Sequence, residues 1–452
     1  MMNNFRAASI FSKIQITDAE KQEVNEYILS ISKNESDQRN FFEYCKKWKL
    51  APWLHVQLNR TGLYQTLNEE TRNSFLHAHQ RIEQENEKRN KEAVRFLRGF
   101  KENNIDVIIL KGNFFAHTVY KDTGYKRMND FDILIRIEDW DRIQDIYFSL
   151  GYIPLGFGWS GEKQKAAKFS HVGMSFISPD YSCIIGSQWG LKSPTTEYTV
   201  NIEEAWNTAL PFDFFDVPVK RLSPEFNLLH LILHMGIFKC GIRDCMDVYN
   251  YLSYERPDEK KFRSLIERSN AVDKTYFTLA LCDLCCGTLK DLYKDLPTTN
   301  SFKMRRLRKR LKVQKESGDF QDSYNDYFQD IEKVVIYFNV FPHFHKKLLF
   351  YLIILKLIFF PKRSAALKLS DHAHGPNLFR TIIARFKAPY YIFALIAQEI
   401  GWKFTFLLFL KLFIDLILSI KNYIIHKESY FDYLRKKGID PKEIEKAVKN
   451  IQ

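Results

Sequence analysis

Two aspartates in one short apolar run, preceded by a Lys-Gly turn, constrain the fold of this chain more than any other feature. Ile105–Leu110 is rich in β-branched residues and ends at Lys111-Gly112, which predicts a buried strand and a turn. A second apolar run contains Asp130 and Asp132 at positions i and i+2. Alternate residues of a strand lie on one face, so the sequence predicts two neighbouring carboxylates on a single face of a sheet.

Two like charges this close repel one another and disfavour ionisation unless a cation lies between them. A carboxylate pair beside a glycine turn therefore suggests a divalent metal site, and Mg²⁺ that carries nucleotide phosphates is the natural occupant. An Asp-x-Asp sequence at a strand edge can also be a solvated polar face. The upstream strand, the Lys-Gly turn and the basic pair Lys126-Arg127 favour the metal site here.

The same block resembles the uncharacterised bacterial nucleotidyltransferases of the DNA polymerase beta-like superfamily. The shared pattern is a strand, a Lys-Gly turn, a helix, an arginine, an Asp-x-Asp strand, a second helix and a Gly-Tyr pair. This chain has Lys111-Gly112, Arg127, Asp130-Phe131-Asp132 and Leu150-Gly151-Tyr152 in that order. The resemblance implies an α+β fold, with a mixed nucleotidyltransferase-type sheet and flanking helices, preceded by a helical segment and followed by a mostly helical C-terminal region.

The resemblance also implies a role for each residue of the block. Asp130 and Asp132 would be the catalytic residues and the Mg²⁺ ligands. The expected nucleotide-binding residues are Lys111, Gly112, Asn113 and Arg127.

Two of these roles have a physical basis in the sequence. A helix over residues 113–123 would direct its first backbone N–H groups at a triphosphate. The planar guanidinium of Arg127 can bind two phosphate oxygens at once. For Lys126 we expect a solvent-exposed charge instead.

The third carboxylate that such nucleotidyltransferases carry on a later strand is missing from its expected position. The matching stretch is Cys183–Leu191, in which Trp189 matches, Gly186 stands in place of the acid and Gln188 replaces a histidine. That carboxylate would take the proton of the attacking hydroxyl or complete a second metal site. Asp180 could replace it only after a register shift of several residues, which a packed sheet does not accommodate easily.

A predicted helix that begins at Ser223 carries His230 and His234 on one face, at the spacing of a zinc pair. No glutamate follows the first histidine and no third ligand is evident, so we expect both rings to pack against the α/β core. Farther along, Arg243 and Asp247 are four residues apart, which favours a structural ion pair, with a phosphate contact of Arg243 as the alternative. These four residues and Trp189 are expected to support the site.

The length of 452 residues and the hydrophobic fraction of 45% allow large buried cores. The seven cysteines are odd in number and unevenly spread, which fits reduced thiols packed in the core of a cytoplasmic protein. No apolar segment follows a basic N-terminal region, so a signal peptide is not expected. The expected parts are an N-terminal helical segment (1–100), a nucleotidyltransferase-like α/β core (101–222), a helical domain packed on the core (223–300) and a basic and apolar helical region (301–452).

The C-terminal region combines basic and apolar helical sequences. Residues 303–312 are strongly basic, with Met304, Leu307 and Leu311 along one stripe. Residues 348–360 and 404–420 are nearly all apolar, but a bilayer-spanning helix needs ~20 apolar residues and tolerates interior charges poorly. We therefore expect buried or interfacial helices, with a peripheral anchor on an anionic inner-membrane surface as the alternative.

The net charge of +13 attracts polyanions in general, and no strong nucleic-acid motif accompanies it. Three hypotheses from different classes follow. The favoured one is an enzyme that transfers a nucleoside monophosphate from an NTP, with ATP expected, to a hydroxyl acceptor. The second is a catalytically degenerate relative that binds a nucleotide or a partner, and the third is a membrane-surface protein of envelope polysaccharide assembly.

Overall fold

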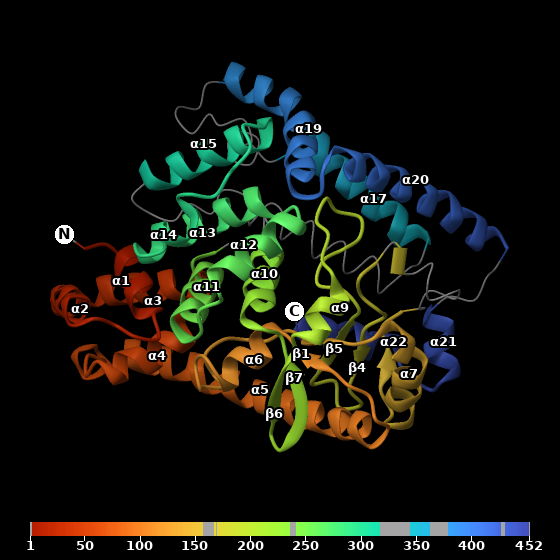
Figure 1. Cartoon of the computed structure of the whole chain (residues 1–452), viewed down its shortest axis with the longest axis horizontal. Coiled ribbons are helices and arrows are strands. Elements are labelled where there is room, and N and C mark those ends of the chain that lie inside the picture. The colour runs from red at the N-terminus through yellow and green to blue at the C-terminus, as the bar shows by residue number, and fades with distance from the viewer. Residues whose placement is uncertain are drawn as a thin grey trace.

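The computed structural model of the chain describes residues 2–156, 167–168, 170–235, 241–316, 344–361, 378–425 and 430–451. Within these ranges, helices surround a seven-stranded mixed sheet (Figure 1). Helices precede the sheet and a mostly helical region follows it. This is the α+β architecture that the sequence predicts.

The N-terminal helices form a layer against the sheet. They are α1 (Asn4–Phe11), α2 (Asp18–Ile31), α3 (Glu35–Lys47), α4 (Ala51–Arg60) and α5 (Glu69–Glu102). Thr17 and Glu20 make both hydrogen bonds of the expected capping box at the start of α2. The 34-residue α5 runs along the bottom of the molecule in Figure 1 and buries Phe75, Phe96 and Phe100.

The sheet has the strand order β3-β4-β5-β2-β1-β7-β6. Its strands are β1 (Ile108–Ile109), β2 (Phe131–Leu134), β3 (Ile153–Pro154), β4 (Phe176–Ile177), β5 (Ile184–Gln188), β6 (Leu210–Phe214) and β7 (Val217–Arg221). The β2–β5 and β1–β7 pairs are parallel, and the other pairs are antiparallel. Because β1 and β2 lie inside the sheet with neighbours on both edges, their apolar side chains are fully buried.

Two expected boundaries near β1 are wrong. The strand is limited to Ile108–Ile109, and the helix expected over 113–123 is α6 (Lys111–His117). The helix starts two residues earlier than expected, because the chain turns at Lys111 itself, whose φ is +52°. It ends early because the Thr118 hydroxyl donates to the carbonyl of Phe114 at 2.7 Å.

Short helices connect the later strands. The expected helix over 137–150 consists of a 3₁₀ turn (Ile137–Asp139) and α7 (Trp140–Ser149). Gly151 follows with φ at +78°, the left-handed conformation that a glycine adopts past a helix end. Farther along, α9 (Ile202–Asn207) precedes the β6–β7 hairpin.

A second group of helices packs after the sheet. It consists of α10 (Pro224–His234), α11 (Ile242–Tyr254), α12 (Glu259–Arg268), α13 (Val272–Cys286), α14 (Lys290–Tyr293) and α15 (Phe302–Glu316). The cysteines of α13 form no disulfide and are buried in the core, as expected. Met304 and Leu307 of α15 are buried, and the exposed residues of this helix are basic.

The C-terminal region contains two separate helical units. A layer of α17 (Phe344–Phe359), α19 (Leu378–Ile400) and α20 (Trp402–Ile424) lies along the upper right of Figure 1. The sequence analysis did not predict α19, which contains Pro389. Within the described part of the chain, no helix is long and apolar enough to cross a membrane.

The last two helices, α21 (Tyr430–Lys436) and α22 (Pro441–Ile451), cover the β3 edge of the sheet. Tyr430, Leu434 and Ile444 pack against Ile153 and other apolar residues of β3, β4 and β5. The Tyr430 hydroxyl also donates to the carbonyl of Pro154 at 2.7 Å. The C-terminal segment therefore completes the core around the sheet.

Candidate functional site

The two aspartates of the central block differ in their surroundings. Asp132 lies within β2 and is only 5% exposed. Asp130 comes just before the strand and is exposed to solvent. One carboxylate is thus part of the sheet and the other faces the surface beside it.

Both carboxylate oxygens of Asp132 are engaged by neighbouring side chains. The Lys111 ammonium lies 2.6 Å from Oδ2, and the Gln188 amide donates to Oδ1 at 3.0 Å. Burial by itself lowers the pKa of Lys111, but the charges of Asp132 and Asp130 outweigh it and raise the pKa above its usual range. The chain therefore supplies a permanent cation to the aspartate pair.

Lys111 adopts a backbone conformation that few non-glycine residues adopt. Its φ of +52° lies in the left-handed region, where the Cβ atom crowds the backbone at a cost of roughly 1–2 kcal/mol. Such strain persists only where the surroundings fix it, and it is common at functional sites. Here the ion pair with Asp132 ties the side chain of this residue to β2.

Gly186 pairs with Asp132 in the parallel register of β2 and β5. A Cβ atom at position 186 would lie 2.4 Å from Oδ1 of Asp132, far inside van der Waals contact. The space that a third carboxylate would enter is therefore filled by the carboxylate of Asp132 itself. Gln188 is two residues farther along β5, on the same face, which explains how its amide reaches the same oxygen.

Trp189 ties the end of β5 to the segment before β4. Its backbone N–H donates to the carbonyl of His171 at 2.9 Å, and its indole N–H donates to the carbonyl of Ser170 at 2.8 Å. Burial, followed by the charges of Lys111 and Lys192, lowers the pKa of His171 to about 4. His171 is therefore a neutral ring close to the Lys111–Asp132 pair.

The two histidines of α10 have different environments. His230 is buried, and burial together with the charges of Lys111 and His171 lowers its pKa far below the usual value. His234 is exposed at the end of the helix, so the expectation that both rings pack against the core is wrong for His234. In the last turn of α10, His234 is exposed, whereas Leu231, Ile232 and Leu233 are buried.

The expected ion pair of Arg243 and Asp247 does not form. Arg243 donates to Asp244 at 3.2 Å. Asp247 instead accepts the Tyr120 hydroxyl at 2.7 Å and the Lys126 ammonium at 2.5 Å. Asp247 is buried, and a buried carboxylate is stabilised best by donors that are buried with it.

The same contact corrects the expectation for Lys126, which is not a solvent-exposed charge. Its side chain is only 15% exposed, and its ammonium is bound to Asp247. The segment that leads to the aspartates is thereby anchored to α11.

A buried asparagine on α5 holds the same segment from the other side. The Asn86 amide donates to the carbonyls of Thr123 at 2.6 Å and Lys126 at 2.9 Å. His79 lies two turns before Asn86 on the same face of α5, and its ring pairs with the carboxylate of Asp122 at 2.9 Å. No local sequence pattern marks these positioning residues, because their partners are about forty positions away.

The other predicted nucleotide-binding residues are engaged within the protein. Arg127 lies 3.3 Å from Glu85 and donates to the carbonyl of Asn450 in α22. The Asn113 side chain is buried, and the Gly112 carbonyl accepts the Tyr125 hydroxyl at 3.4 Å. Of this group, Lys111 contacts Asp132.

Asp180 lies in the turn between β4 and β5. Its carboxylate accepts hydrogen bonds from Ser178 at 2.6 Å and from the Ser182 hydroxyl at 2.8 Å. Burial raises the pKa of this carboxyl, but those hydrogen bonds prevail and lower it. Asp180 therefore stabilises a turn and does not replace the missing acid at position 186.

The donor set limits which metal centre these residues can hold. Among the described residues there is no group of three or more His, Cys, Asp or Glu side chains placed to hold a metal ion. A pair of carboxylates can hold one Mg²⁺ when phosphate oxygens and water complete its shell. Asp130 and Asp132 supply two carboxylates here, whereas a two-metal centre would need a further carboxylate that Gly186 does not provide.

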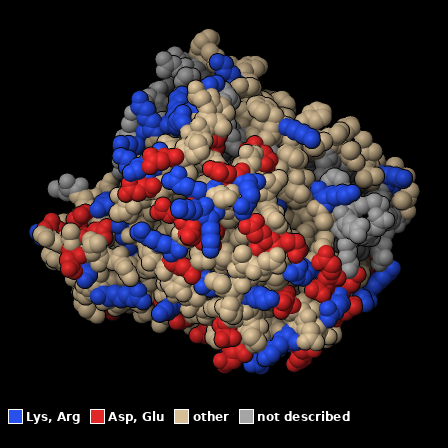
Figure 2. Space-filling view, in the orientation of Figure 1, with Lys and Arg blue, Asp and Glu red and all other residues tan. Residues whose placement is uncertain are grey.

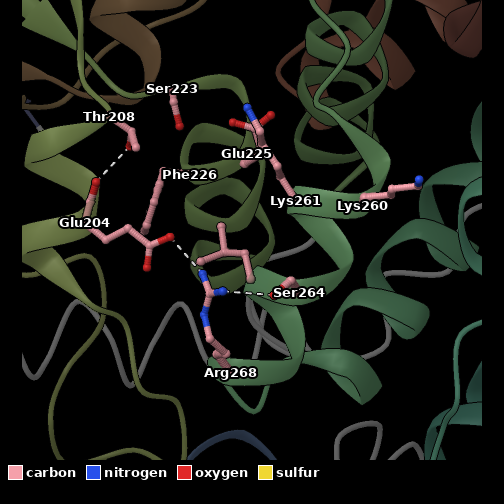
Figure 3. Close-up of a pocket in the computed structure, with 10 residues that line it drawn as sticks. Glu204, Thr208, Ser223, Glu225, Phe226, Lys260, Lys261, Ser264 and Arg268 are labelled. Atoms are coloured by element: carbon pink, nitrogen blue, oxygen red, sulfur yellow. Dashed lines mark hydrogen bonds and ion pairs between the residues drawn. The ribbon is translucent and has the colours of Figure 1, made fainter.

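A cavity of about 340 Å³ lies elsewhere, between α9, α10 and α12 (Figure 3). The Arg268 guanidinium crosses it and donates to Glu204 at 2.8 Å and to Ser264 at 2.9 Å. None of the residues predicted from the sequence lines this cavity. The cavity is therefore separate from the aspartate pair.

The sheet and the placement of its aspartates can be compared with known proteins. Residues 34–287 match the family described as "Uncharacterised nucleotidyltransferase". The chain belongs to this nucleotidyltransferase family. The matched range contains Lys111, both aspartates and Gly186, and it ends at the close of α13. No curated protein and no solved structure gives a significant match.

Proposed function

We propose that this nucleotidyltransferase binds a nucleoside triphosphate, with ATP expected, at Asp130 and Asp132 through one Mg²⁺. The observation that carries the proposal is the pairing of Asp132 with Gly186, which leaves two carboxylates at the site. Two carboxylates and the phosphates of a nucleotide are a common shell for Mg²⁺. When bound, the ion would neutralise phosphate charge and orient the triphosphate.

Lys111 has a defined part in this proposal. Its ammonium is held on Asp132 at 2.6 Å and balances the charge of the aspartate pair. Lysine is a flexible point charge that binds phosphate well. The arrival of a nucleotide would let the ammonium turn from the carboxylate to a phosphate oxygen, so that charge balance is kept in both states.

Efficient transfer to a hydroxyl needs a group that takes its proton. Gly186 offers none, and the neutral His171, whose pKa is lowered to about 4, is a weak base at neutral pH. These observations support nucleotide binding with slow transfer. Family membership supports the second candidate function, transfer of a nucleoside monophosphate to a hydroxyl acceptor.

An assay with α-labelled ATP tests both candidates. The purified chain is incubated with the nucleotide and Mg²⁺, and retained label and released pyrophosphate are measured before and after denaturation. Slow transfer predicts label that is retained by the native chain, is lost on denaturation and is accompanied by little pyrophosphate. Pyrophosphate release at ordinary enzymatic rates, abolished in Asp130→Asn/Asp132→Asn, would establish transfer instead.

The matched control is Asp145→Asn, which changes an exposed acid on α7 outside the site. It should retain label like the wild type. A chain that retains no label under any condition would refute nucleotide binding at this site.

A further inference from the structure

The layer of α17, α19 and α20 exposes apolar side chains in regular stripes. On α19 the exposed stripe is Leu378, Ile382, Phe386 and Tyr390, at a spacing of four residues. Phe386 is 84% exposed. Side chains at this spacing lie on one face of a helix, so α19 shows solvent a continuous apolar face.

The exposed face of α19 is not the face that packs inside the layer. Up to Ile392, its buried positions are Thr381, Ala384, Ala388 and Ile392, which lie on the opposite side of the helix from this stripe. Phe393 stacks on Phe409 of α20 with ring centroids 4.1 Å apart. The stripe from Leu378 to Tyr390 is therefore exposed in the first part of the helix, whereas the same side packs on α20 farther along, at Phe393.

The neighbouring helices repeat the pattern. On α20, Trp402, Phe406, Phe413 and Ile417 are exposed at helical spacing. On α17, the exposed stripe includes Leu352, Leu355 and Phe359. Apolar patches of this extent are rare on the surface of monomeric proteins and usually mark an interaction site.

The charged residues of these helices are mostly basic. Residues 344–361 and 378–425 contain nine Lys or Arg and only two acids, Glu399 and Asp415. Lys356, Arg385, Lys387, Lys403 and Lys421 are exposed. In Figure 2, the upper right of the molecule is largely tan with scattered blue, where α17, α19 and α20 lie in Figure 1.

We propose that this layer docks on the surface of an anionic lipid bilayer, with its apolar stripes in the headgroup region. Apolar stripes flanked by Lys and Arg are the pattern of helices that lie in the membrane interface. Long basic side chains can extend their charges to the phosphates while their stems stay among apolar groups. Trp402, 58% exposed at the start of α20, suits the boundary between headgroups and acyl chains.

Two observations favour a bilayer surface over other occupants. None of the described helices can cross a membrane, so the layer would lie on the surface. A second copy of the chain would bring the same basic residues face to face, and like charges at an interface are unfavourable. The basic exposed side of α15, on the upper side of the molecule in Figure 1, adds attraction to anionic lipid.

The test is flotation of the full chain with vesicles of phosphatidylcholine alone or with added phosphatidylglycerol. We expect flotation with the anionic vesicles, weakened by salt. The triple variant Phe386→Ser/Phe406→Ser/Phe413→Ser should bind roughly 10- to 100-fold more weakly, because three exposed aromatic rings no longer enter the lipid. Its circular dichroism spectrum and melting temperature should match those of the wild type.

The matched control is Leu29→Ser/Phe148→Ser/Tyr254→Ser, which removes exposed apolar side chains from other faces. It should float like the wild type. The emission of Trp402 is the part of the tryptophan fluorescence that is missing from the Trp402→Phe variant. Brominated lipids should quench this part, which would place Trp402 at the membrane contact. Failure of the folded wild type to float, or a dimer in solution that the Phe386 triple variant converts to monomer, would overturn the proposal.

Discussion

Oδ1 of Asp132 lies where it would come within 2.4 Å of any Cβ atom at position 186. The two residues are direct partners in the β2–β5 register. The position of the Asp132 carboxylate therefore leaves no room for an acidic side chain at position 186. The carboxylate of Asp132 is held there by Lys111 and Gln188. The Asp132 carboxylate is therefore packed among Gly186, Lys111 and Gln188.

Gly186→Ala tests this packing. We expect it to lower the free energy of unfolding by about 1–3 kcal/mol, because the new methyl group must displace the Asp132 carboxylate or the β5 backbone. Urea unfolding measures the change. In an Asp132→Ala background the same substitution should cost much less, and equal costs in both backgrounds would contradict the predicted contact.

Lys111→Met removes the cation from Asp132 and keeps much of the side-chain volume. His171 should respond, because after burial the Lys111 charge is the main cause of its lowered pKa. We expect the pKa of His171 to rise from about 4 toward 6.5 in the variant. Nuclear magnetic resonance of labelled histidine rings measures this, and an unchanged His171 pKa would place Lys111 elsewhere.

The neutral histidines also predict how stability depends on pH. His171 has a folded-state pKa of about 4 against an ordinary value of 6.5, so the unfolded chain binds more protons between these pH values. Its contribution to stability is present above pH 6.5 and is lost as the pH falls toward 4. Urea unfolding at a series of pH values measures this effect. Between pH 6.5 and 4 the free energy of unfolding should fall less in His171→Gln than in the wild type.

Asp247→Ala should destabilise the chain by roughly 2–4 kcal/mol, since it leaves the buried Lys126 ammonium and Tyr120 hydroxyl without their acceptor. Thermal unfolding measures the loss. Asp244→Ala on the same helix is the comparison, because its partner Arg243 is less buried than Lys126. A smaller loss for Asp247→Ala than for Asp244→Ala would contradict the anchoring role of Asp247.

Leu434→Ala tests the packing of α21 on the sheet edge. The side chain is fully buried against residues of β3 to β5, and truncation of such a leucine costs about 2–5 kcal/mol. Chemical denaturation should show that loss in the whole cooperative transition. Leu355→Ala, on an exposed position of α17, should change the free energy of unfolding very little.

The sequence was most informative where structure is decided locally. The Thr17 capping box and the glycine after α7 follow from neighbouring residues, and both were predicted. The aspartate strand was also predicted, because its apolar pattern and its motif agree. The resemblance put Gly186 at the position of the third acid, and the structure adds that this residue pairs with Asp132.

Contacts between distant segments could not be predicted in this way. Lys126 and Asp247 are 121 positions apart, and no local pattern brings them together. The α21–α22 segment looks charged and polar in sequence, yet its few apolar residues complete the core at β3. α19 was missed because it contains Pro389, which normally interrupts a helix.

The affinity for ATP, measured by titration calorimetry with and without Mg²⁺, tests the central proposal most directly. Binding should require Mg²⁺ and should weaken by ~10-fold or more in Asp132→Asn, which corresponds to a loss of ~1.4 kcal/mol. The control Asp145→Asn should bind like the wild type. Binding that is independent of Mg²⁺ and unchanged in Asp132→Asn would contradict a nucleotide site at the aspartate pair.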